Sequence, residues 1–188
     1  MKKKLLIAFA LLLLCTLANA QIPTSGNVFF GYSYLNSNSL VDLSQRSSLN
    51  GWEASLEGKI IPWVGIVADF SRHYGSESGV NAVGTCAIMV TCSPLNVNTN
   101  IQNYLFGSRV SVSVGKVRPF AEALFGAAHF SADQGGSDTS FATALGGGLD
   151  YKIIRPVAWR FQGDYVQTRF FGATQNDVRL STGIVLRF

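Results

Sequence analysis

The sequence predicts an all-β protein, an eight-stranded antiparallel transmembrane up-and-down β-barrel preceded by a cleaved signal peptide. Three observations predict this fold. The chain begins with an export signal. The rest of it is divided into segments of alternating apolar and polar residues, about 9–12 residues long, the length of a tilted membrane-spanning strand. The connections between these segments alternate long and short, as a barrel with all its short turns on one side of a membrane requires.

The export signal occupies the first twenty residues. Three lysines follow Met1, and an apolar run from Leu5 to Leu17 precedes Ala18-Asn19-Ala20, the small–x–small pattern at which signal peptidase cuts. A membrane-spanning helix needs about 20 apolar residues, so this run is too short to be one. We therefore expect residues 1–20 to be a signal peptide and residues 21–188 to form a single barrel domain.

The net charge of the exported part argues against a nucleic-acid-binding protein. The whole chain has 15 Lys and Arg against 11 Asp and Glu, a formal charge of +4. Three of those lysines belong to the signal, and no basic run remains once it is removed. A basic surface for phosphate contacts is therefore not expected.

Two cysteines, Cys86 and Cys92, remain in the exported part. A pair of cysteines in an oxidising compartment predicts a disulfide, and two free thiols are the alternative. Further metal ligands are lacking in the sequence around them, so neither a metal nor a cofactor is expected.

The strands can be placed in order along the chain. The predicted segments are Asn27 to Leu35, Leu49 to Lys59, Val64 to Tyr74, Ile101 to Val114, Val117 to Phe130, Ser140 to Lys152, Val157 to Phe170, and Val178 to Phe188. Short turns at Ile60 to Trp63, at Gly115-Lys116 and at Ile153 to Pro156 are expected on the periplasmic side. The four longer connections are then extracellular loops.

The longest of these loops, Gly75 to Asn100, leaves one alternative open. Val80 to Val83 and Ala87 to Val90 could form a further hairpin, which would make a barrel of ten strands. Eight strands are preferred because both runs are too short to cross a membrane.

The two-residue period also sorts the side chains by face. Charged residues recur on one face of successive strands, which we expect to be the inner face. The expected interior charges are Glu53, Glu57, Asp69, Arg109, Glu122, Asp150, Lys152, Arg160, Asp164, Arg179 and Arg187. The acids and bases nearly balance, and an eight-stranded barrel has room for little more than side chains. The pattern therefore predicts a paired, polar plug, and a narrow ion path is the alternative.

Aromatic residues near the strand ends are typical of the girdles that mark membrane interfaces. On the periplasmic side we expect Trp63, Phe120, Tyr151, Trp159 and Phe188. On the outer side we expect Tyr32, Tyr34, Phe70, Tyr74, Tyr104, Phe130, Phe141, Phe170 and Phe171.

Several stretches carry a family resemblance. They are RPFAEALFGAAH (Arg118 to His129), LGGGLDYK (Leu145 to Lys152), RFQGDYVQTRF (Arg160 to Phe170) and QNDVRLSTGIVLRF (Gln175 to Phe188). With them the chain resembles the outer-membrane protein β-barrel domain family, which includes small OmpA-type, OmpX-type and opacity-type barrels. The resemblance implies a barrel in the outer membrane of a Gram-negative bacterium, reached through Sec export, and says little about activity.

The final alternating strand, ending in Ile184, Leu186 and Phe188, resembles the signal that the barrel-assembly machinery reads. The implied partners are that machinery, periplasmic chaperones, outer-membrane lipid and lipopolysaccharide. A ligand bound by the extracellular loops is left open.

These observations predict a non-enzymatic scaffold that presents four loops at the cell surface. A small ion-conducting channel is one alternative. A lipid A deacylase is another, because His129 and Ser131 share a face of one strand, with Asp133 and Asp138 as available acids. A soluble lipocalin-like barrel would need an apolar lumen, which the recurring interior charges argue against.

Overall fold

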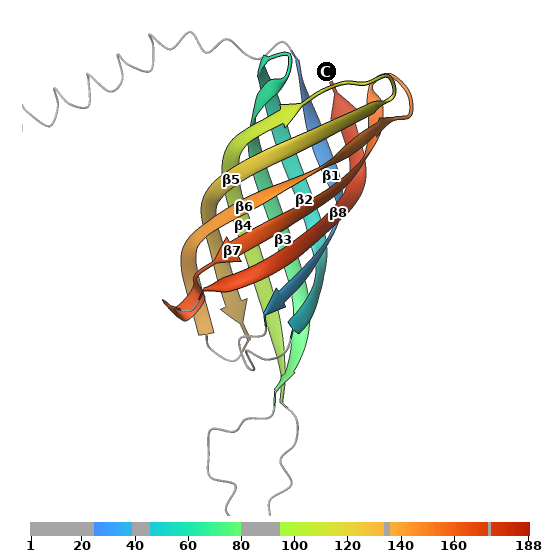
Figure 1. The fold of residues 1–188 in the computed structure, drawn as a ribbon. Helices are drawn as coiled ribbons and strands as arrows, with labels where there is room; N and C mark the ends of the chain where they lie inside the picture. The colour runs from blue at the N-terminus through green and yellow to red at the C-terminus, as the bar shows by residue number, and fades with distance from the viewer. Residues whose placement is uncertain (1–24, 39–45, 80–94, 134–135, 173) are drawn as a thin grey trace, which may run out of the picture.

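A computed structural model describes residues 25–38, 46–79, 95–133, 136–172 and 174–188. They form a closed barrel in which each strand pairs antiparallel with its neighbours in sequence and β1 pairs with β8 (Figure 1). The strands are β1 (Gly26–Asn38), β2 (Arg46–Ile61), β3 (Val64–Gly79), β4 (Leu95–Ser111), β5 (Val117–Ala132), β6 (Gly136–Lys152), β7 (Val157–Thr168) and β8 (Gln175–Arg187). The predicted strand number and topology are confirmed.

The two ends of the barrel differ. One end, here called the turn end, holds the short connections 62–63, 112–116 and 153–156 together with Gly26 and Phe188. These two residues exchange backbone hydrogen bonds of 2.9 and 3.1 Å, which complete the ring of strands. The opposite end, the loop end, holds the other four connections, including a 3₁₀ turn, η1 (Phe170–Gly172). No helix in the described ranges is long and apolar enough to cross a membrane.

Strand boundaries differ from prediction mainly at the loop end. The β3–β4 pairing continues as far as Gly79 and Leu95, well into the segment predicted to be a loop. β4 also ends at Ser111, whereas the sequence analysis extended it to Val114, because its register with β3 ends where β3 begins. Paired strands keep their backbone hydrogen bonds beyond the membrane, whatever the polarity of their side chains. Cys86, Cys92 and the two short runs Val80 to Val83 and Ala87 to Val90 lie outside the described residues.

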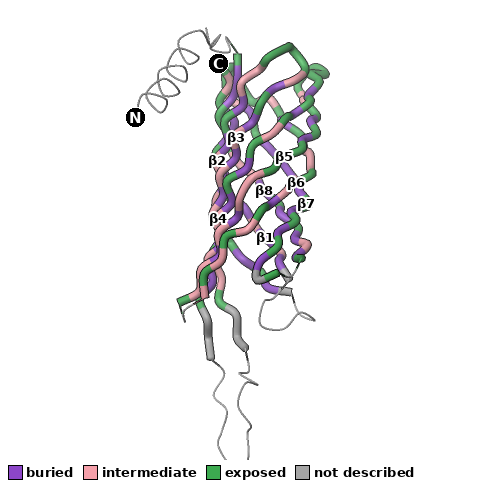
Figure 2. Tube along the Cα trace, turned by 90° about the vertical axis from the view of Figure 1, so that its left-hand side faces the viewer, coloured by how far each residue is buried: buried purple, intermediate pink, exposed green. Residues whose placement is uncertain are grey.

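Side chains alternate between the interior and the outer face along each strand, as Figure 2 shows by the change from buried to exposed. In β7, Arg160, Gln162 and Asp164 are buried, while Trp159 and Phe161 are exposed. This is the two-residue period of a strand. The closed sheet therefore has an interior of mixed polarity and an apolar outer face.

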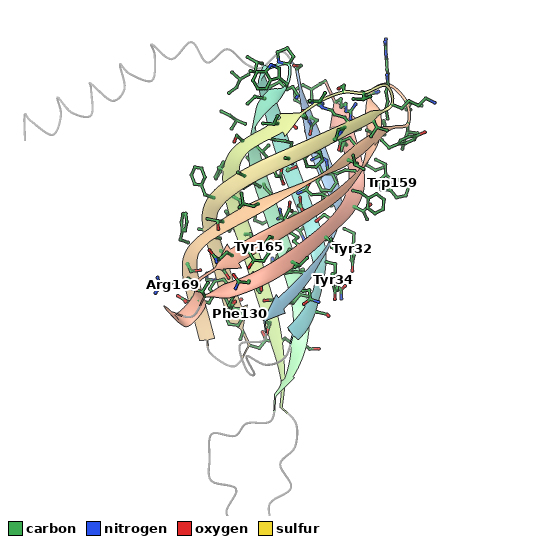
Figure 3. The ribbon with its side chains drawn as sticks, viewed as in Figure 1. Tyr32, Tyr34, Phe130, Trp159, Tyr165 and Arg169 are labelled. Carbon is green, nitrogen blue, oxygen red and sulfur yellow. The ribbon has the colours of Figure 1, made fainter. Side chains whose placement is uncertain are left out.

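The outer face carries rows of aromatic rings. Phe30, Trp52, Phe70 and Tyr104 form a chain across β1 to β4, with successive ring centroids 6.0, 5.1 and 4.8 Å apart. Tyr32 and Tyr34 lie nearer the loop end and Trp159 nearer the turn end (Figure 3). An apolar surface of this extent is far larger than soluble proteins normally expose.

Three residues of the predicted girdles are placed differently. Phe120, Phe130 and Phe170 are 7, 5 and 0% exposed and lie in the interior. Phe120 lies two residues from Glu122 on β5, so both side chains must point to the same face. Phe130 is on that same face, and Phe170 turns inward from η1 against it, with their ring centroids 5.7 Å apart. The side chain of Phe171 lies outside the described part.

Candidate functional site

The barrel interior has two regions. Residues from the middle to the turn end form a network of charged and amide side chains, here called the charged network. Residues from the loop end to the middle form an apolar cluster. Each region is built from the inward positions of several strands, so the closure of the sheet brings together residues that are distant in sequence.

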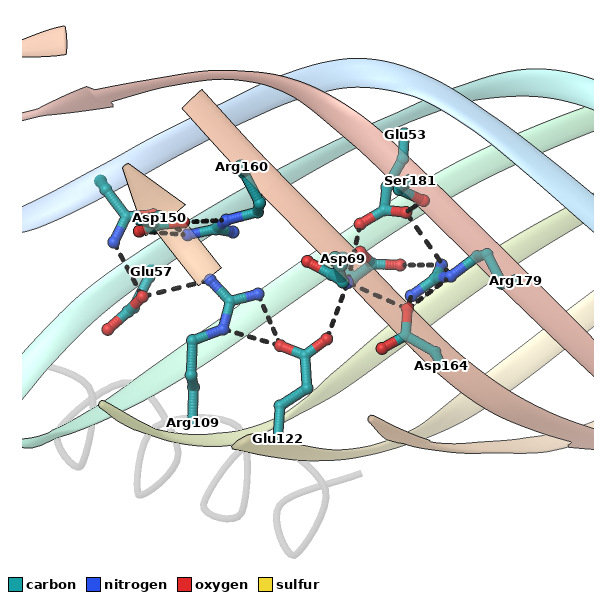
Figure 4. Close-up of polar contacts among 12 residues, drawn as sticks. Glu53, Glu57, Asp69, Arg109, Glu122, Asp150, Arg160, Asp164, Arg179 and Ser181 are labelled. Carbon is teal, nitrogen blue, oxygen red and sulfur yellow. Dashed lines mark hydrogen bonds and ion pairs between the residues drawn. The ribbon is translucent and has the colours of Figure 1, made fainter. Parts of the chain in front are cut away.

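At the centre of the charged network, one guanidinium meets three carboxylates. Arg179 of β8 lies 2.8 Å from Asp69 of β3, 2.8 Å from Asp164 of β7 and 3.5 Å from Glu53 of β2 (Figure 4). All four side chains are almost fully buried. Buried charges are costly unless they are paired and hydrogen-bonded, so this arrangement depends on the single arginine.

Gln162 of β7 connects this centre to the next group. Its Nε2 lies 3.1 Å from Glu53, 2.9 Å from Asp164 and 2.9 Å from Glu122. The Ser181 hydroxyl donates to the second Glu53 oxygen at 2.5 Å. Three carboxylates share the single Arg179, and the neutral donors Gln162 and Ser181 supply the further hydrogen bonds that stabilise them.

Nearer the turn end lies a second arginine. Arg109 Nε donates to Glu122 at 2.7 Å, and Arg109 Nη1 donates to Glu57 at 3.2 Å. Asn27 of β1 also donates to Glu57, at 2.7 Å. The guanidinium carbon of Arg109 lies 4.5 Å from the ring centroid of Phe120, so this ring, predicted to face lipid, contributes to the interior instead.

The third arginine, Arg160, donates to Asp150 at 2.7 Å. Its guanidinium carbon lies between two rings, 5.0 Å from the Phe29 centroid and 4.7 Å from the Phe120 centroid. Arg187 reaches the other Asp150 oxygen at 3.2 Å from the rim of the turn end. Charge pairing therefore continues from the centre of the barrel to this rim.

The predicted interior charges can now be located individually. The structure places nine of them inside the barrel with 5% exposure or less: Glu53, Glu57, Asp69, Arg109, Glu122, Asp150, Arg160, Asp164 and Arg179. Lys152 and Arg187 are half-buried at the turn end. Lys59 and Arg118 join the network there, 3.3 and 3.8 Å from Glu57, although neither was in the predicted set.

The neutral members of the network were also missed. Asn27, Gln162 and Ser181 are buried on inward positions. Gln162 and Ser181 each lie two residues from an inward charge on their own strand, so the alternation that identified the charges could have identified them. β1, which carries Asn27, has no charged residue, so this signal was lacking there.

The apolar cluster fills the interior toward the loop end. Its buried members are Leu35, Leu49, Val67, Ile101, Leu105, Leu124, Ala128, Phe130, Ala142, Ala144, Val166 and Phe170. A polar plug was predicted for the interior, so the many apolar side chains toward the loop end differ from the prediction. Phe130 and Phe170 were assigned to the outer girdle there, which hid two of the largest members of the cluster.

His73 lies beside the apolar cluster and is fully buried. Its Nε2 lies 2.9 Å from the Ser33 hydroxyl, and the Ser33 Oγ lies 2.9 Å from the Oγ of Ser181. A chain of hydroxyl groups thus links His73 to the Glu53 side of the charged network.

His129 and Ser131 are on the outward-facing side of β5. The Nδ1 atom of His129 lies 2.8 Å from the Thr139 hydroxyl on β6. Ser131 is opposite Ser137 in the β5–β6 register. A nucleophilic serine needs a base within hydrogen-bond reach, and the partner that His129 has in this structure is a threonine.

A polar pocket of about 430 Å³ opens at the loop end. It is lined by Tyr74, Gly75, Ser76, Asn98, Thr99, Asn100 and Asp133. Asn98 donates to Asp133 at 2.9 Å, and Arg72 donates to Asn100 at 3.2 Å while lying over the Tyr74 ring. Amide, carboxylate and tyrosine groups here could hydrogen-bond a polar ligand. Across the ranges that the structure describes, no group of three or more His, Cys, Asp and Glu side chains is arranged to hold a metal ion.

Known proteins share this architecture. The model of one protein family, the outer membrane protein beta-barrel domain, matches residues 6–188. The search of curated proteins gave no match. Among solved structures, neisserial surface protein A is 12% identical with a TM-score of 0.60, over 87% of this chain and 97% of that one.

Two further structures share the fold. Ail, the attachment invasion locus protein of Yersinia pestis, is 12% identical with a TM-score of 0.53, over 87% of this chain and 98% of that chain. The N-terminal β-barrel domain of Pseudomonas aeruginosa OprF is 13% identical with a TM-score of 0.52, over 87% and 96% of the two chains. At these identities the likeness concerns the fold alone.

Proposed function

Because this chain belongs to the outer membrane protein β-barrel domain family, we propose that it is a non-enzymatic scaffold in the outer membrane. In this proposal the lumen is closed by side chains and the loop end is an interaction surface facing outward. The turn end then faces the periplasm, where the short turns of such barrels lie.

The observation that carries this proposal is the filling of the interior by two complementary regions. The charged network crosses the barrel from β3 to β8 through the Arg179–Asp69 contact. The apolar cluster lies toward the loop end beside neutral buried side chains such as Asn103 and Gln175, and its Phe130 and Phe170 rings pack against each other. An eight-stranded barrel filled in this way supports a rigid platform rather than a transport path.

The channel alternative has less support. A narrow ion path needs polar groups or water along its whole length. The charged network offers charged groups from Glu53 to Arg187. Toward the loop end the apolar cluster fills part of the interior, and the buried polar side chains beside it, such as Asn103, Thr168 and Gln175, are neutral. Desolvating an ion beside Phe130 and Phe170 would be costly.

The deacylase alternative also has less support. In a catalytic triad a carboxylate holds the Nδ1 atom of the histidine, but Nδ1 of His129 is bonded to the Thr139 hydroxyl of β6. The carboxylate of Asp133 accepts from Asn98 of β4 instead. Neither acid–base pair needed for an activated serine is supported by these contacts.

The partners proposed for the scaffold follow from its two surfaces. The outward Arg72 and Tyr74 near the polar loop-end pocket suit the phosphate and sugar groups of lipopolysaccharide. An extracellular ligand would use the same end. The barrel-assembly machinery and periplasmic chaperones would act earlier, on the exported chain, after Sec transport and removal of residues 1–20.

Planar-bilayer recording tests the proposal. The protein beginning at Gln21, refolded and inserted, is expected to give no current steps. Insertion is checked independently by the shift in gel mobility between heated and unheated samples. Reproducible current steps from inserted protein would contradict a closed lumen and would favour the channel.

A further inference from the structure

A second pocket lies at the turn end, with a volume of about 300 Å³. Its lining residues are Lys152, Ile154, Arg155, Pro156, Arg187 and Phe188. The turn between β6 and β7 forms one wall, closed by paired backbone bonds of 3.1 and 2.9 Å between Ile154 and Val157. The end of β8 forms the other wall, held by the bond of 2.9 Å from Arg187 N to the Pro156 carbonyl.

The pocket carries an excess of positive charge. Three of its six lining residues are cationic, and none is acidic. Two side-chain carboxylates lie near the turn end in the described part of the chain, and both are buried and shared among several cations. Asp150 contacts Arg160 and Arg187. Glu57 contacts Arg109, Lys59 and Arg118 at 3.2 to 3.8 Å.

The terminal carboxylate of Phe188 offsets one of these charges. One of its oxygens accepts from the Gly26 amide of β1 at 2.9 Å. The three cations of the lining, Lys152, Arg155 and Arg187, still outnumber it. The potential at this rim is therefore positive over several neighbouring residues.

The remaining walls are apolar and exposed. Ile154 is 60% and Phe188 61% exposed, although both border the cationic side chains. From the pocket toward the middle of the barrel, the apolar outer face continues with the exposed side chains of Leu186, Tyr151 and Trp159. The pocket thus lies where the apolar face ends and the basic rim begins.

From this combination we propose that the turn-end pocket binds the headgroup of an anionic phospholipid from the periplasmic leaflet. Lys152 and Arg155 hold the phosphate oxygens, while Ile154 and Phe188 contact the glycerol and the first acyl carbons. The proposal rests on the proposed function in one respect, that the turn end faces the periplasmic leaflet.

The pairing of cations with exposed apolar walls favours a lipid over a free anion. Inorganic phosphate would gain nothing from Ile154 and Phe188. A phospholipid uses both, because its phosphate is charged and its glycerol and acyl carbons are apolar. The apolar strip from Leu186 to Trp159 also leads from the pocket along the surface where acyl chains would lie.

Lipid retention tests the proposal on the whole folded protein. The protein is extracted from nanodiscs that contain equal amounts of phosphatidylglycerol and phosphatidylcholine, and bound lipids are counted by native mass spectrometry. Wild type is expected to retain phosphatidylglycerol selectively. The double variant Lys152→Gln/Arg155→Gln is expected to lose this preference by about 25-fold, or about fivefold for each cation. Arg187 is left unchanged because it is bonded to Asp150.

A matched control is Lys116→Gln, which removes one rim cation outside the pocket lining and should change the preference by less than twofold. Equal retention of phosphatidylglycerol by wild type and the double variant would overturn the proposal. So would equal retention of both lipids by wild type, or displacement of phosphatidylglycerol by excess inorganic phosphate, which would mark a free-anion site. Retention is measured without reference to current, so conductance from this protein would overturn the closed lumen and leave the lipid result standing.

Discussion

Arg179 on β8 and Asp69 on β3 form an ion pair of 2.8 Å through the barrel interior, although β1 and β2 separate their strands in the sheet. The same guanidinium serves Asp164 and Glu53. Opposite walls of the barrel are thereby joined by a single side chain. Arg179 therefore neutralises three buried carboxylates from three different strands.

Replacement of Arg179 with methionine should destabilise the barrel by about 3–5 kcal/mol, because it leaves buried carboxylates without their cation. The free energy of unfolding is measured by urea titration of the protein folded in phospholipid vesicles. Arg169→Met, at an exposed position of the loop end, is the control and should change it by less than about 0.5 kcal/mol. If Arg179→Met lowered the free energy of unfolding as little as Arg169→Met does, the assigned pairing would be contradicted.

Gly31→Ala should disturb the pairing of β1 with β8. Gly31 is opposite Gly183, and a Cβ there would lie 2.8 Å from the Gly183 Cα and would also meet the Thr182 backbone oxygen. We expect a loss of about 1–3 kcal/mol from this overpacking. Gly163→Ala is the matched control, since its Cβ would meet only the Leu180 side chain, at 3.4 Å. Equal stability of the two variants would show that the strands can separate to accept the methyl group.

Phe130→Ala/Phe170→Ala tests which region closes the lumen. The double variant removes two of the largest side chains from the apolar cluster and leaves the charged network intact. If the apolar cluster is the barrier, the refolded double variant gives current steps that wild type lacks. Phe141→Ala, which removes an exposed ring from the outer face, should remain silent. A silent double variant with native gel mobility would assign closure to the charged network alone.

Ser131→Ala should leave the acylation of lipid A unchanged. His129 Nδ1 is bonded to the Thr139 hydroxyl and not to a carboxylate, so the imidazole lacks the acid that orients the base of a catalytic triad. Lipid A from cells that express wild type, the variant or an empty vector is compared by mass spectrometry. Loss of an acyl chain in wild type alone would establish the enzyme and overturn the scaffold.

Much of the interior could be predicted from the sequence because strand alternation assigns faces without knowledge of partners. Glu53, Asp69 and Arg179 follow from that rule alone. The partners could not be predicted, because they depend on the tilt and stagger with which the sheet closes. Gln162 shows the limit, since nothing local indicates that its amide contacts carboxylates on β2, β5 and β7.

The mistaken girdle residues have a different cause. Phe120 was assigned by its closeness to a strand end, although its spacing from Glu122 placed it inside. The aromatic type of Phe120 predicted the outer face, whereas its spacing from Glu122 predicted the interior. The spacing was right because side chains alternate strictly between the two faces of a strand. Phe170 lies in η1, beyond the end of β7, but it is an even number of residues from Arg160 and is buried, so the same alternation would have placed it inside as well.

The pairing of Gly26 with Phe188 also has a consequence for folding kinetics. The ring of strands closes through contacts between residues at opposite ends of the sequence, such as Asn27 with Arg187. Non-local contacts of this kind must be preceded by a large loss of chain entropy, so they form late and slowly. Until β8 docks, β1 and β8 both present unpaired edges, which favour aggregation. Pairing of β1 with β8 should therefore be the rate-limiting step in folding. Catalysts that shield these two edges from other chains would accelerate folding most.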